Sequence, residues 1–440
     1  MGADLLDAAT LSLLPISATC DDQGRLCLAG QRLTDLAREW GTPLYLYDAA
    51  TVRHQLEALH ATLAANYPAG HEITYAAKAY LSLSFARHLA ALGVGVDVVS
   101  LGELAVARRG GLAPSQIHLH GNNKTPEELK AALEGGVQAV VVDNLDELEL
   151  LEAIAGEQKR RVRIWLRIAP GVTAATHAYS QTGHHSTKFG LAANDGQAVE
   201  AISRARQSQW LKLVGLHMHI GSQISEPERY REGIRALYGV ARQAEYCPEE
   251  FSPGGGWHVR YLPNDPEVPL NAWVEEVSAA IREECARSDW PLPKLVLEPG
   301  RWLVARAGLA LYTVGACKQS GDGTRWVAVD GGMADNPRPA LYGARYIALA
   351  ADRATAPPTQ TVKVVGKFCE AGDFLIAEAR LPEVKRGDCL VMPVAGAYQL
   401  SMASNYNLAG RPAVLWVTEG GVEVMQPRED VTQMQWWMGA

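Results

Sequence analysis

Short runs of apolar and β-branched residues alternate with longer runs of helical spacing through the middle of the chain. Strands that alternate with helices pair in parallel, because a parallel neighbour needs a crossover connection. Eight such units predict an α/β fold with a (β/α)8 barrel. The predicted strands are residues 73–78, 94–100, 117–121, 139–144, 163–169, 213–221, 250–256 and 294–300, and the clearest helices are 84–92, 103–109, 126–134 and 145–155.

The pattern changes after about residue 305. Runs rich in Val, Leu, Ile and Tyr recur there, with turn residues between them, which is typical of an antiparallel β domain. Strand-like runs around Cys27 and Tyr45 are expected to join that domain. We therefore predict an N-terminal segment of the β domain at 1–40, a barrel at 41–305 and a C-terminal β domain at 306–440. The C-terminal runs are residues 310–317, 326–329, 361–365, 389–393 and 413–418.

The composition agrees with globular domains and argues against several partners. Hydrophobic residues make up 48% and charged residues 20% of the 440 residues, an ordinary mix for folded proteins. A net charge of −8 without a long basic run argues against nucleic acid and anionic membranes. No apolar stretch approaches about 18 residues, so no transmembrane helix is expected. The seven cysteines lack paired spacing, which predicts reduced thiols in the cytoplasm.

Polar residues gather at the predicted C-terminal ends of the barrel strands, where barrel enzymes place their chemistry. Lys78 ends the first strand. A lone lysine at such a position usually faces solvent. Here Ile73, Ala76 and Ala77 are apolar neighbours, and a desolvated lysine loses its proton more readily and can form a Schiff base. The other polar strand ends carry Asp97, Ser100, residues 122–124, Asp143, His217, His219, the glycines 254–256, Glu298 and Arg301.

Three of these features have more than one interpretation. His217 and His219 share a strand face, so they could bind a metal, lie flat on a cofactor ring or be core histidines. The glycines 254–256 form either a plain turn or a cradle of N–H groups for a phosphate. Glu298 either pairs with Arg301 or faces a pyridine nitrogen and keeps it protonated. Together, the lysine, imidazole, glycines and carboxylate are what bound pyridoxal phosphate requires.

At this point the chain resembles the fold-type III pyridoxal-phosphate decarboxylases, in particular the branch that acts on diaminopimelate. The resemblance runs from about residue 41 to 408, and ten segments in the expected order make it specific. They are YAAKAY (75–80), DVVSLGEL (97–104), HGNNK (120–124), KFG (188–190), GLHMHIGSQI (215–224), GGG (254–256), EPGR (298–301), VDGGMADNPRPALYGA (329–344), CEAGD (369–373) and GAYQLSMASNYN (396–407).

The resemblance implies a role for each matching residue and no metal site. Lys78 would hold pyridoxal 5'-phosphate and His219 would stack on its ring. Cys369 would donate a proton after carbon dioxide leaves. In relatives the 369–370 segment reaches the other subunit's active site, which implies a homodimer with shared sites. The remaining cofactor contacts would be Ser222, Gly256, Glu298, Gly300, Arg301 and Tyr398, and the substrate contacts Arg301, Arg338, Tyr342, Glu370 and Tyr398.

The residue types also suggest the substrate, a small amino acid. Two arginines suit a distal carboxylate through bidentate bonds, and Glu370 suits a distal ammonium. A substrate with both groups is meso-2,6-diaminopimelate, and its product would be L-lysine. Decarboxylases of ornithine, lysine, carboxylated polyamines or carrier-linked acids, and a pyridoxal-phosphate homeostasis protein, are the alternatives. The chain departs from the usual pattern at Tyr80, Trp257, His258 and Gln399.

Overall fold

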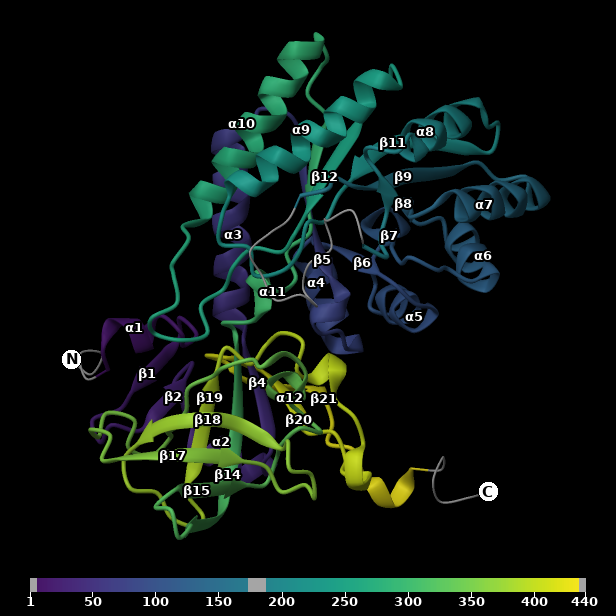
Figure 1. The fold of residues 1–440 in the computed structure, drawn as a ribbon. Helices are drawn as coiled ribbons and strands as arrows, with labels where there is room; N and C mark the ends of the chain where they lie inside the picture. Colours follow the sequence, from purple (N-terminus) through teal and green to yellow (C-terminus); the bar gives the residue numbers. More distant parts are fainter. Residues whose placement is uncertain (1–5, 173–186, 435–440) are drawn as a thin grey trace. The chain divides into compact units, whose positions relative to one another are not determined.

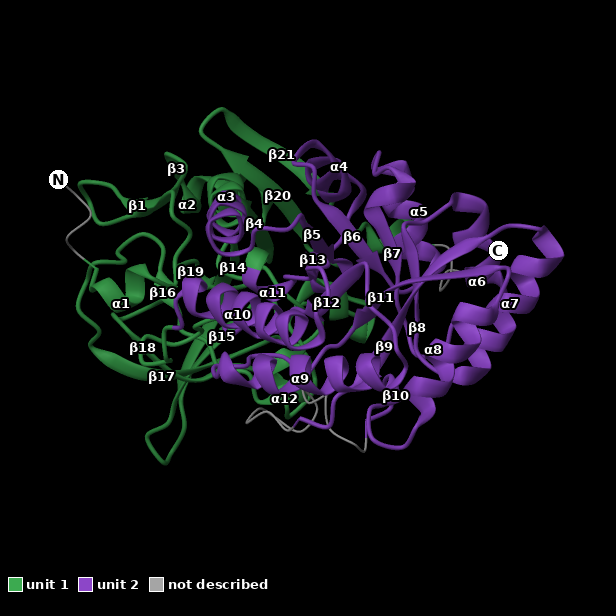
Figure 2. Cartoon of the chain, turned by 90° about the horizontal axis from the view of Figure 1, so that it is seen from above, with its two compact units in different colours: residues 1–56, 259–267, 303–440 green, residues 57–258, 268–302 purple. Residues whose placement is uncertain are grey.

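The computed structural model describes residues 6–172 and 187–434, and the chain divides into two compact units (Figure 2). One unit contains residues 57–258 and 268–302, and the other contains 1–56, 259–267 and 303–440. We call them the barrel unit and the β unit. The domain limits at residues 40 and 305 stay a prediction, while the compact units change at residues 56 and 302.

The barrel unit is built on eight parallel strands in a closed ring. Strand β13 pairs with β5 through Leu297 and Ile73, and β8 pairs with β9, so no edge is left open. All eight predicted strands are present, which confirms the (β/α)8 fold. The strands are β5 (His71–Ala76), β6 (Gly95–Val98), β7 (Ile117–Leu119), β8 (Ala139–Val142), β9 (Val162–Ala169), β11 (Leu211–His217), β12 (Glu250–Gly254) and β13 (Lys294–Leu297), with the short β10 (Leu191–Ala192) beside β9.

Helices follow the strands and lie outside them (Figure 1). Four begin at a polar residue whose side chain accepts an N–H bond three residues on: Ser82, Ser100, Thr125 and Asn144. These caps fix where each loop turns into a helix. The helices are α3 (Ala49–Asn66), α4 (Leu83–Ala91), α5 (Leu101–Arg109), α6 (Pro126–Gly135), α7 (Leu145–Gln158), α8 (Gln197–Gln207), α9 (Glu228–Gln243), α10 (Leu270–Ser288) and α11 (Arg301–Val304).

The β unit centres on one long strand, β14 (Gly308–Gln319), which pairs antiparallel with β4, β15 and β19. The sheet is mainly antiparallel, but β15 pairs in parallel with β17 and β4 with β20. All five predicted runs are strands. The others are β4 (Leu44–Asp48), β15 (Arg325–Val329), β16 (Leu349–Ala350), β17 (Gln360–Val365), β18 (Phe374–Leu381), β19 (Cys389–Pro393), β20 (Ala413–Thr418) and β21 (Gly421–Gln426).

The two predicted N-terminal runs belong to different sheets. The run around Tyr45 is β4, which enters the large sheet between β14 and β20. The run around Cys27 is β2 (Leu26–Leu28), and it forms a separate three-stranded sheet with β1 (Ala18–Cys20) and β3 (Gln31–Arg32). Leu26 and Leu28 nevertheless share one hydrophobic core with the large sheet. The remaining helices of this unit are α1 (Ala8–Leu11), α2 (Leu33–Trp40) and α12 (Arg338–Tyr342).

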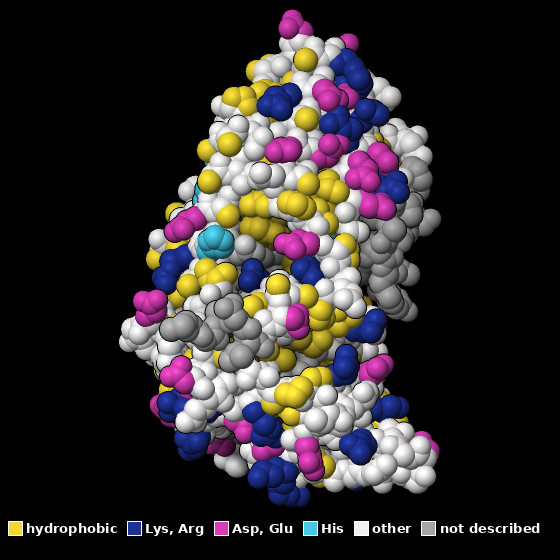
Figure 3. Space-filling model, turned by 90° about the vertical axis from the view of Figure 1, so that its left-hand side faces the viewer, with side chains coloured by type: hydrophobic (Ala, Val, Ile, Leu, Met, Phe, Trp, Pro, Cys, Tyr) yellow, Lys and Arg dark blue, Asp and Glu magenta, His cyan; other side chains and the backbone are white. Residues whose placement is uncertain are grey.

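The surface mixes charges of both signs. On the face drawn in Figure 3, acidic and basic side chains are interspersed with apolar ones, so this face has no field of a single sign. Within the described residues, no helix combines the length and apolarity needed to cross a membrane.

Candidate active site

Lys78 lies directly after strand β5, in a single 3-10 turn formed by Ala77–Ala79. Its alanine neighbours in the turn are buried, but the lysine side chain is exposed. The predicted desolvation of Lys78 is therefore wrong for this structure, because the apolar neighbours face the core. The Tyr75 hydroxyl donates to the Tyr80 carbonyl at 2.8 Å and braces the turn. An accessible amine on a rigid strand end can reach a carbonyl ligand.

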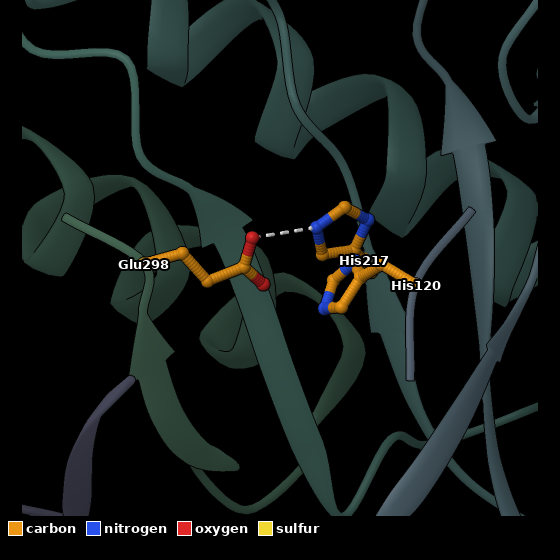
Figure 4. A group of neighbouring side chains, drawn as sticks. All are labelled: His120, His217 and Glu298. Atoms are coloured by element: carbon orange, nitrogen blue, oxygen red, sulfur yellow. Dashed lines mark hydrogen bonds and ion pairs between the residues drawn. The ribbon is translucent and has the colours of Figure 1, made fainter. Parts of the chain in front are cut away.

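Glu298 directly follows strand β13, and it is 8% exposed. His217 Nε2 lies 3.0 Å from one carboxylate oxygen (Figure 4). Ser252 Oγ donates to the other oxygen at 2.6 Å. Burial alone would raise the pKa of Glu298, but His217, His120 and the Ser252 hydroxyl lower it below its ordinary value. The carboxylate is thus held anionic. The side-chain contacts described for Glu298 are those with His217 and Ser252, and which of its two predicted roles it has stays a prediction.

The spacing in the sequence suggests that His217 pairs with His219, but its neighbour in the structure is His120. His120 from the end of β7 lies near it, with ring centroids 5.0 Å apart, and these two imidazoles and Glu298 place ligand atoms within 4.8 Å of one another (Figure 4). Such a set could coordinate Zn²⁺. Burial lowers the pKa of His120 well below its ordinary value. That no metal is used stays a prediction.

His219, two residues beyond His217, is only partly buried. Burial of its ring, together with the positive charges of Lys78 and Arg167, lowers the pKa of His219 well below its ordinary value. A neutral imidazole offers an uncharged flat face. The charge state thus suits stacking on an aromatic ring better than ion pairing.

The glycines at the end of β12 allow three strand ends to approach closely. A Cβ atom on Gly254 would lie 2.6 Å from the Met218 carbonyl, and one on Gly255 would lie 2.1 Å from the Glu298 carbonyl. At Gly256, where φ is +100°, it would lie 2.1 Å from the Gly221 carbonyl. No side chain fits at these positions, so the backbone is left bare around the cradle.

Two further predicted phosphate ligands meet beside this cradle. Arg301 donates through NH2 to Ser222 Oγ at 3.1 Å. The Ile224 N–H donates to the Gly256 carbonyl at 3.0 Å, which ties the Ser222 segment to the glycines. Gly300 is buried in the turn before Arg301. A guanidinium, a hydroxyl and bare backbone are the groups that bind phosphate.

Other polar strand-end residues serve the scaffold. Lys124 is buried, and its ammonium donates at 2.7 Å to the Gly121 and Val141 carbonyls and to Glu147. Asp97 is buried and accepts the Thr74 hydroxyl at 3.0 Å. Burial and the charge of Glu298 raise the pKa of Asp97 well above its ordinary value.

In the β unit, Arg338 begins helix α12 and is only 7% exposed. Its NH1 donates to the Tyr346 hydroxyl at 2.6 Å and to the Tyr261 hydroxyl at 3.1 Å. Its guanidinium also lies over the Tyr261 ring, 5.1 Å from the centroid. Among the described residues, Arg338 has no carboxylate partner. A buried cation that contacts only neutral groups is suited to bind an anion.

The predicted proton donor, Cys369, and the residue predicted to bind the substrate's ammonium, Glu370, lie on one loop between β17 and β18. Cys369 and Glu370 are both exposed there. The Cys369 N–H donates to Asn407 Oδ1 at 3.4 Å, and the Tyr406 hydroxyl lies 3.5 Å from Glu370 Oε2. The loop thus presents a thiol and a carboxylate side by side, away from the unit's core.

The remaining predicted residues are two tyrosines and the positions at which the chain departs from the usual pattern of the family. Tyr342 ends α12 and Tyr398 follows β19, where its φ is +62°; both are partly buried. Three of the unusual residues, Tyr80, Trp257 and Gln399, are buried. They therefore pack into the scaffold.

Sequence reasoning missed several residues that support the site. Ser252 stands two residues before Gly254 on β12, so the strand period of two could have placed it on the same face. Tyr261 and Tyr346 stand 77 and 8 residues from Arg338. No sequence signal joined them, because only the folded chain brings them together.

The barrel unit has residues suited to each chemical group of pyridoxal phosphate. Lys78 would supply an amine for the aldehyde, His219 a flat neutral ring and Glu298 a buried anion for the ring nitrogen. The cradle with Ser222 and Arg301 suits the phosphate. A family model described as "Pyridoxal-dependent decarboxylase, pyridoxal binding domain" matches residues 50–305. Fold, site and family model together define a pyridoxal-dependent decarboxylase with pyridoxal phosphate as cofactor.

Known proteins narrow this class. The chain is 44% identical to diaminopimelate decarboxylase of Actinosynnema pretiosum subsp. auranticum, over 93% of this chain and 91% of that protein. It is 40% identical to diaminopimelate decarboxylase of Bacillus subtilis, over 93% and 94%. A crystal structure of M. jannaschii diaminopimelate decarboxylase in co-complex with L-lysine matches with a TM-score of 0.86 and 32% identity, covering 95% of this chain and 96% of that one. The chain belongs to the diaminopimelate decarboxylase family.

Proposed function

We propose that this protein decarboxylates meso-2,6-diaminopimelate to L-lysine and carbon dioxide. The observation that carries this substrate choice is Arg338, a buried guanidinium without an anionic partner among the described residues. Ornithine and lysine have no distal carboxylate and would leave that charge uncompensated. The relatives named above carry the same activity in their names.

The barrel residues would hold and tune the cofactor, which when bound withdraws electrons from the carbon that loses its carboxylate. Lys78 would bind it through the amine, and His219 would cover one ring face. Glu298, held anionic by His217 and Ser252, would keep a proton at the ring nitrogen. Gly256, Gly300, Ser222, Arg301 and Tyr398 would bind the phosphate and ring substituents.

The β-unit residues would position the substrate and deliver the proton. Arg338, with Arg301, Tyr342 and Tyr398, would bind the carboxylates, and Glu370 would bind the distal ammonium. The Cys369 thiol would protonate the substrate carbon once carbon dioxide has left. Because both Cys369 and Glu370 are exposed on one loop, they are suited to serve a second subunit.

We also propose a homodimer with two shared active sites and a cytoplasmic location. The loop that carries Cys369 and Glu370 matches the segment that crosses between subunits in relatives. All seven cysteines are free thiols, which suits a reducing compartment.

The test is a product assay on the purified protein loaded with pyridoxal phosphate. Incubation with meso-diaminopimelate should release L-lysine, while ornithine and lysine should give little putrescine or cadaverine. Release of either diamine at a rate that matches or exceeds lysine release would contradict the proposed substrate.

A further inference from the structure

Asp373 is the last residue of the CEAGD segment, and only 4% of it is exposed. Its Oδ2 accepts the Phe368 N–H at 2.9 Å, and its Oδ1 accepts the Met333 N–H at 2.6 Å. Phe368 directly precedes Cys369, whereas Met333 lies in the loop that leads to Arg338. One carboxylate therefore ties together two loops that are far apart in sequence.

The packing around this carboxylate shows that the position is built for it. A Cβ atom on Gly332 would lie 2.5 Å from Asp373 Oδ1, and one on Gly366 would lie 2.2 Å from Oδ2. Glycine at both positions makes room for the two oxygens. Among the described residues Asp373 forms no ion pair. The carboxylate thus serves the two backbone N–H groups.

The backbone of Asp373 closes the Cys369 loop as well. The Gly366 N–H donates to the Asp373 carbonyl at 3.0 Å, and the Asp373 N–H donates to the Glu370 carbonyl at 3.1 Å. The Arg338 loop has its own support, because Asp335 Oδ1 accepts the Gly332 N–H at 2.8 Å. Between the two loops, the Asp373 side chain is the charged link.

We propose that Asp373 is a positioning residue that sets the Arg338 loop and the Cys369–Glu370 loop in register. It acts both on binding of the distal carboxylate and on delivery of the proton. This inference rests on the proposed function. If the active sites are shared, Asp373 joins a loop that serves its own subunit's site to one that serves the partner's.

The first test compares Asp373→Asn with Asp388→Asn in the loaded enzyme. An asparagine keeps one acceptor oxygen but turns its amide group toward the other N–H. We expect kcat/KM for diaminopimelate to fall about 10- to 100-fold, with KM raised and kcat lowered, and with pyridoxal-phosphate content unchanged. Gly366→Ala would place a methyl group against Asp373 Oδ2, at a position whose backbone is not left-handed. It should lower kcat/KM in the same direction, but by less.

Asp388 is a matched control. It is buried in the same unit, accepts the Lys385 N–H at 2.8 Å and pairs with Arg353, but it supports neither loop. Asp388→Asn should lower the melting temperature and leave KM unchanged. If Asp373→Asn also changes only the melting temperature and the amount of active enzyme, its role is merely structural and the inference is overturned.

The second test separates the two loops in tagged, purified heterodimers. With Lys78→Ala in one subunit and Asp373→Asn in the other, the single live site has a disturbed Arg338 loop but an intact Cys369 loop. Its KM should rise while kcat per live site stays near wild type. With both substitutions in one subunit and a wild-type partner, the single live site has an intact Arg338 loop but a disturbed Cys369–Glu370 loop. Its kcat should fall, because delivery of the proton is impaired, and its KM should rise less than in the first heterodimer.

The possible failures can be told apart. If wild-type enzyme releases no lysine from diaminopimelate, the proposed function falls and this inference falls with it. If the wild-type enzyme is active but the two heterodimers show the same defect, the link between the two loops is overturned and the proposed function stands.

Discussion

At the scale of single residues, the site depends on groups whose charge is set by their neighbours. Glu298 is the clearest case. Its two oxygens are bound by His217 and Ser252, and these bonds keep it anionic in a buried place. Arg338 is the opposite case, a buried cation that the described residues leave without a counter-charge. We propose that the first arrangement tunes the bound cofactor and that the second binds a carboxylate of the substrate.

Lys78 should carry the cofactor. Borohydride treatment of the loaded enzyme should fix pyridoxal phosphate onto Lys78 irreversibly, because its exposed amine stands at the end of β5 and its charge acts on His219. Peptide mapping by mass spectrometry checks this. Lys124, which is buried and fully bonded, provides an internal comparison and should stay unmodified. An adduct on any lysine other than Lys78 would contradict the assignment.

Arg338 should decide substrate choice. Arg338→Ala should lower kcat/KM for diaminopimelate by about 30- to 1000-fold, which corresponds to about 2–4 kcal/mol for a buried charged bond. Arg338→Lys should recover little, because lysine lacks the planar fork. Steady-state kinetics on substrates with and without the distal carboxylate measure the effect.

The matched control for Arg338 is Arg345→Ala, which removes an exposed guanidinium from the same segment. It should leave kcat/KM near wild type. Equal losses on both kinds of substrate for Arg338→Ala would show that this arginine supports the fold rather than the substrate.

At the scale of elements, buried carboxylates fix the positions of loops. Asp335 accepts the hydroxyls of Tyr312 at 2.6 Å and Tyr45 at 3.0 Å, and these tyrosines come from strands β14 and β4. The loop before α12 is therefore anchored to two strands of the central sheet. Anchoring of this kind places Arg338 more precisely than a free loop could.

This anchor predicts a pH dependence. Burial, opposed by the tyrosine hydroxyls and the Gly332 N–H, raises the pKa of Asp335 from 3.8 to about 6. A carboxyl with a raised pKa stabilises the fold when protonated, so its contribution is full below pH 3.8 and is lost as the pH rises through about 6. The free energy of unfolding of wild type relative to Asp335→Asn should fall by about 3 kcal/mol across that window.

Thermal or denaturant unfolding of both proteins between pH 4 and pH 7 measures this difference. The asparagine does not titrate, so it serves as the reference at every pH. A constant difference across the window would show that Asp335 does not titrate there.

At the scale of the whole molecule, the proposed dimer makes each active site depend on two chains. Lys78→Ala and Cys369→Ala homodimers should each be nearly inactive. After subunit exchange, each hybrid has one complete site, so a 1:1 mixture should recover about one quarter of wild-type activity. Activity assays after mixing, with exchange verified by differently tagged subunits, measure the recovery.

Glu383→Ala, which removes an exposed side chain far in sequence from both residues, is the control partner. Mixed with Lys78→Ala, it should give activity in proportion to its own share of subunits. Verified exchange between Lys78→Ala and Cys369→Ala without recovery would rule out shared sites.

The sequence by itself determined the barrel, because alternating strands and helices have one closed parallel solution and their caps lie in the sequence. It also placed Lys78, His219, the glycines and Glu298 at strand ends. Strands β18 and β21 were not predicted, because their residues mix buried and exposed positions without regular alternation. Only the tertiary structure showed that Lys78 is exposed, that Glu298 bonds to His217 and Ser252, and that Arg338 lies between two tyrosines. These contacts join residues far apart in the chain, and burial and pairing become defined only when the strands that carry them meet.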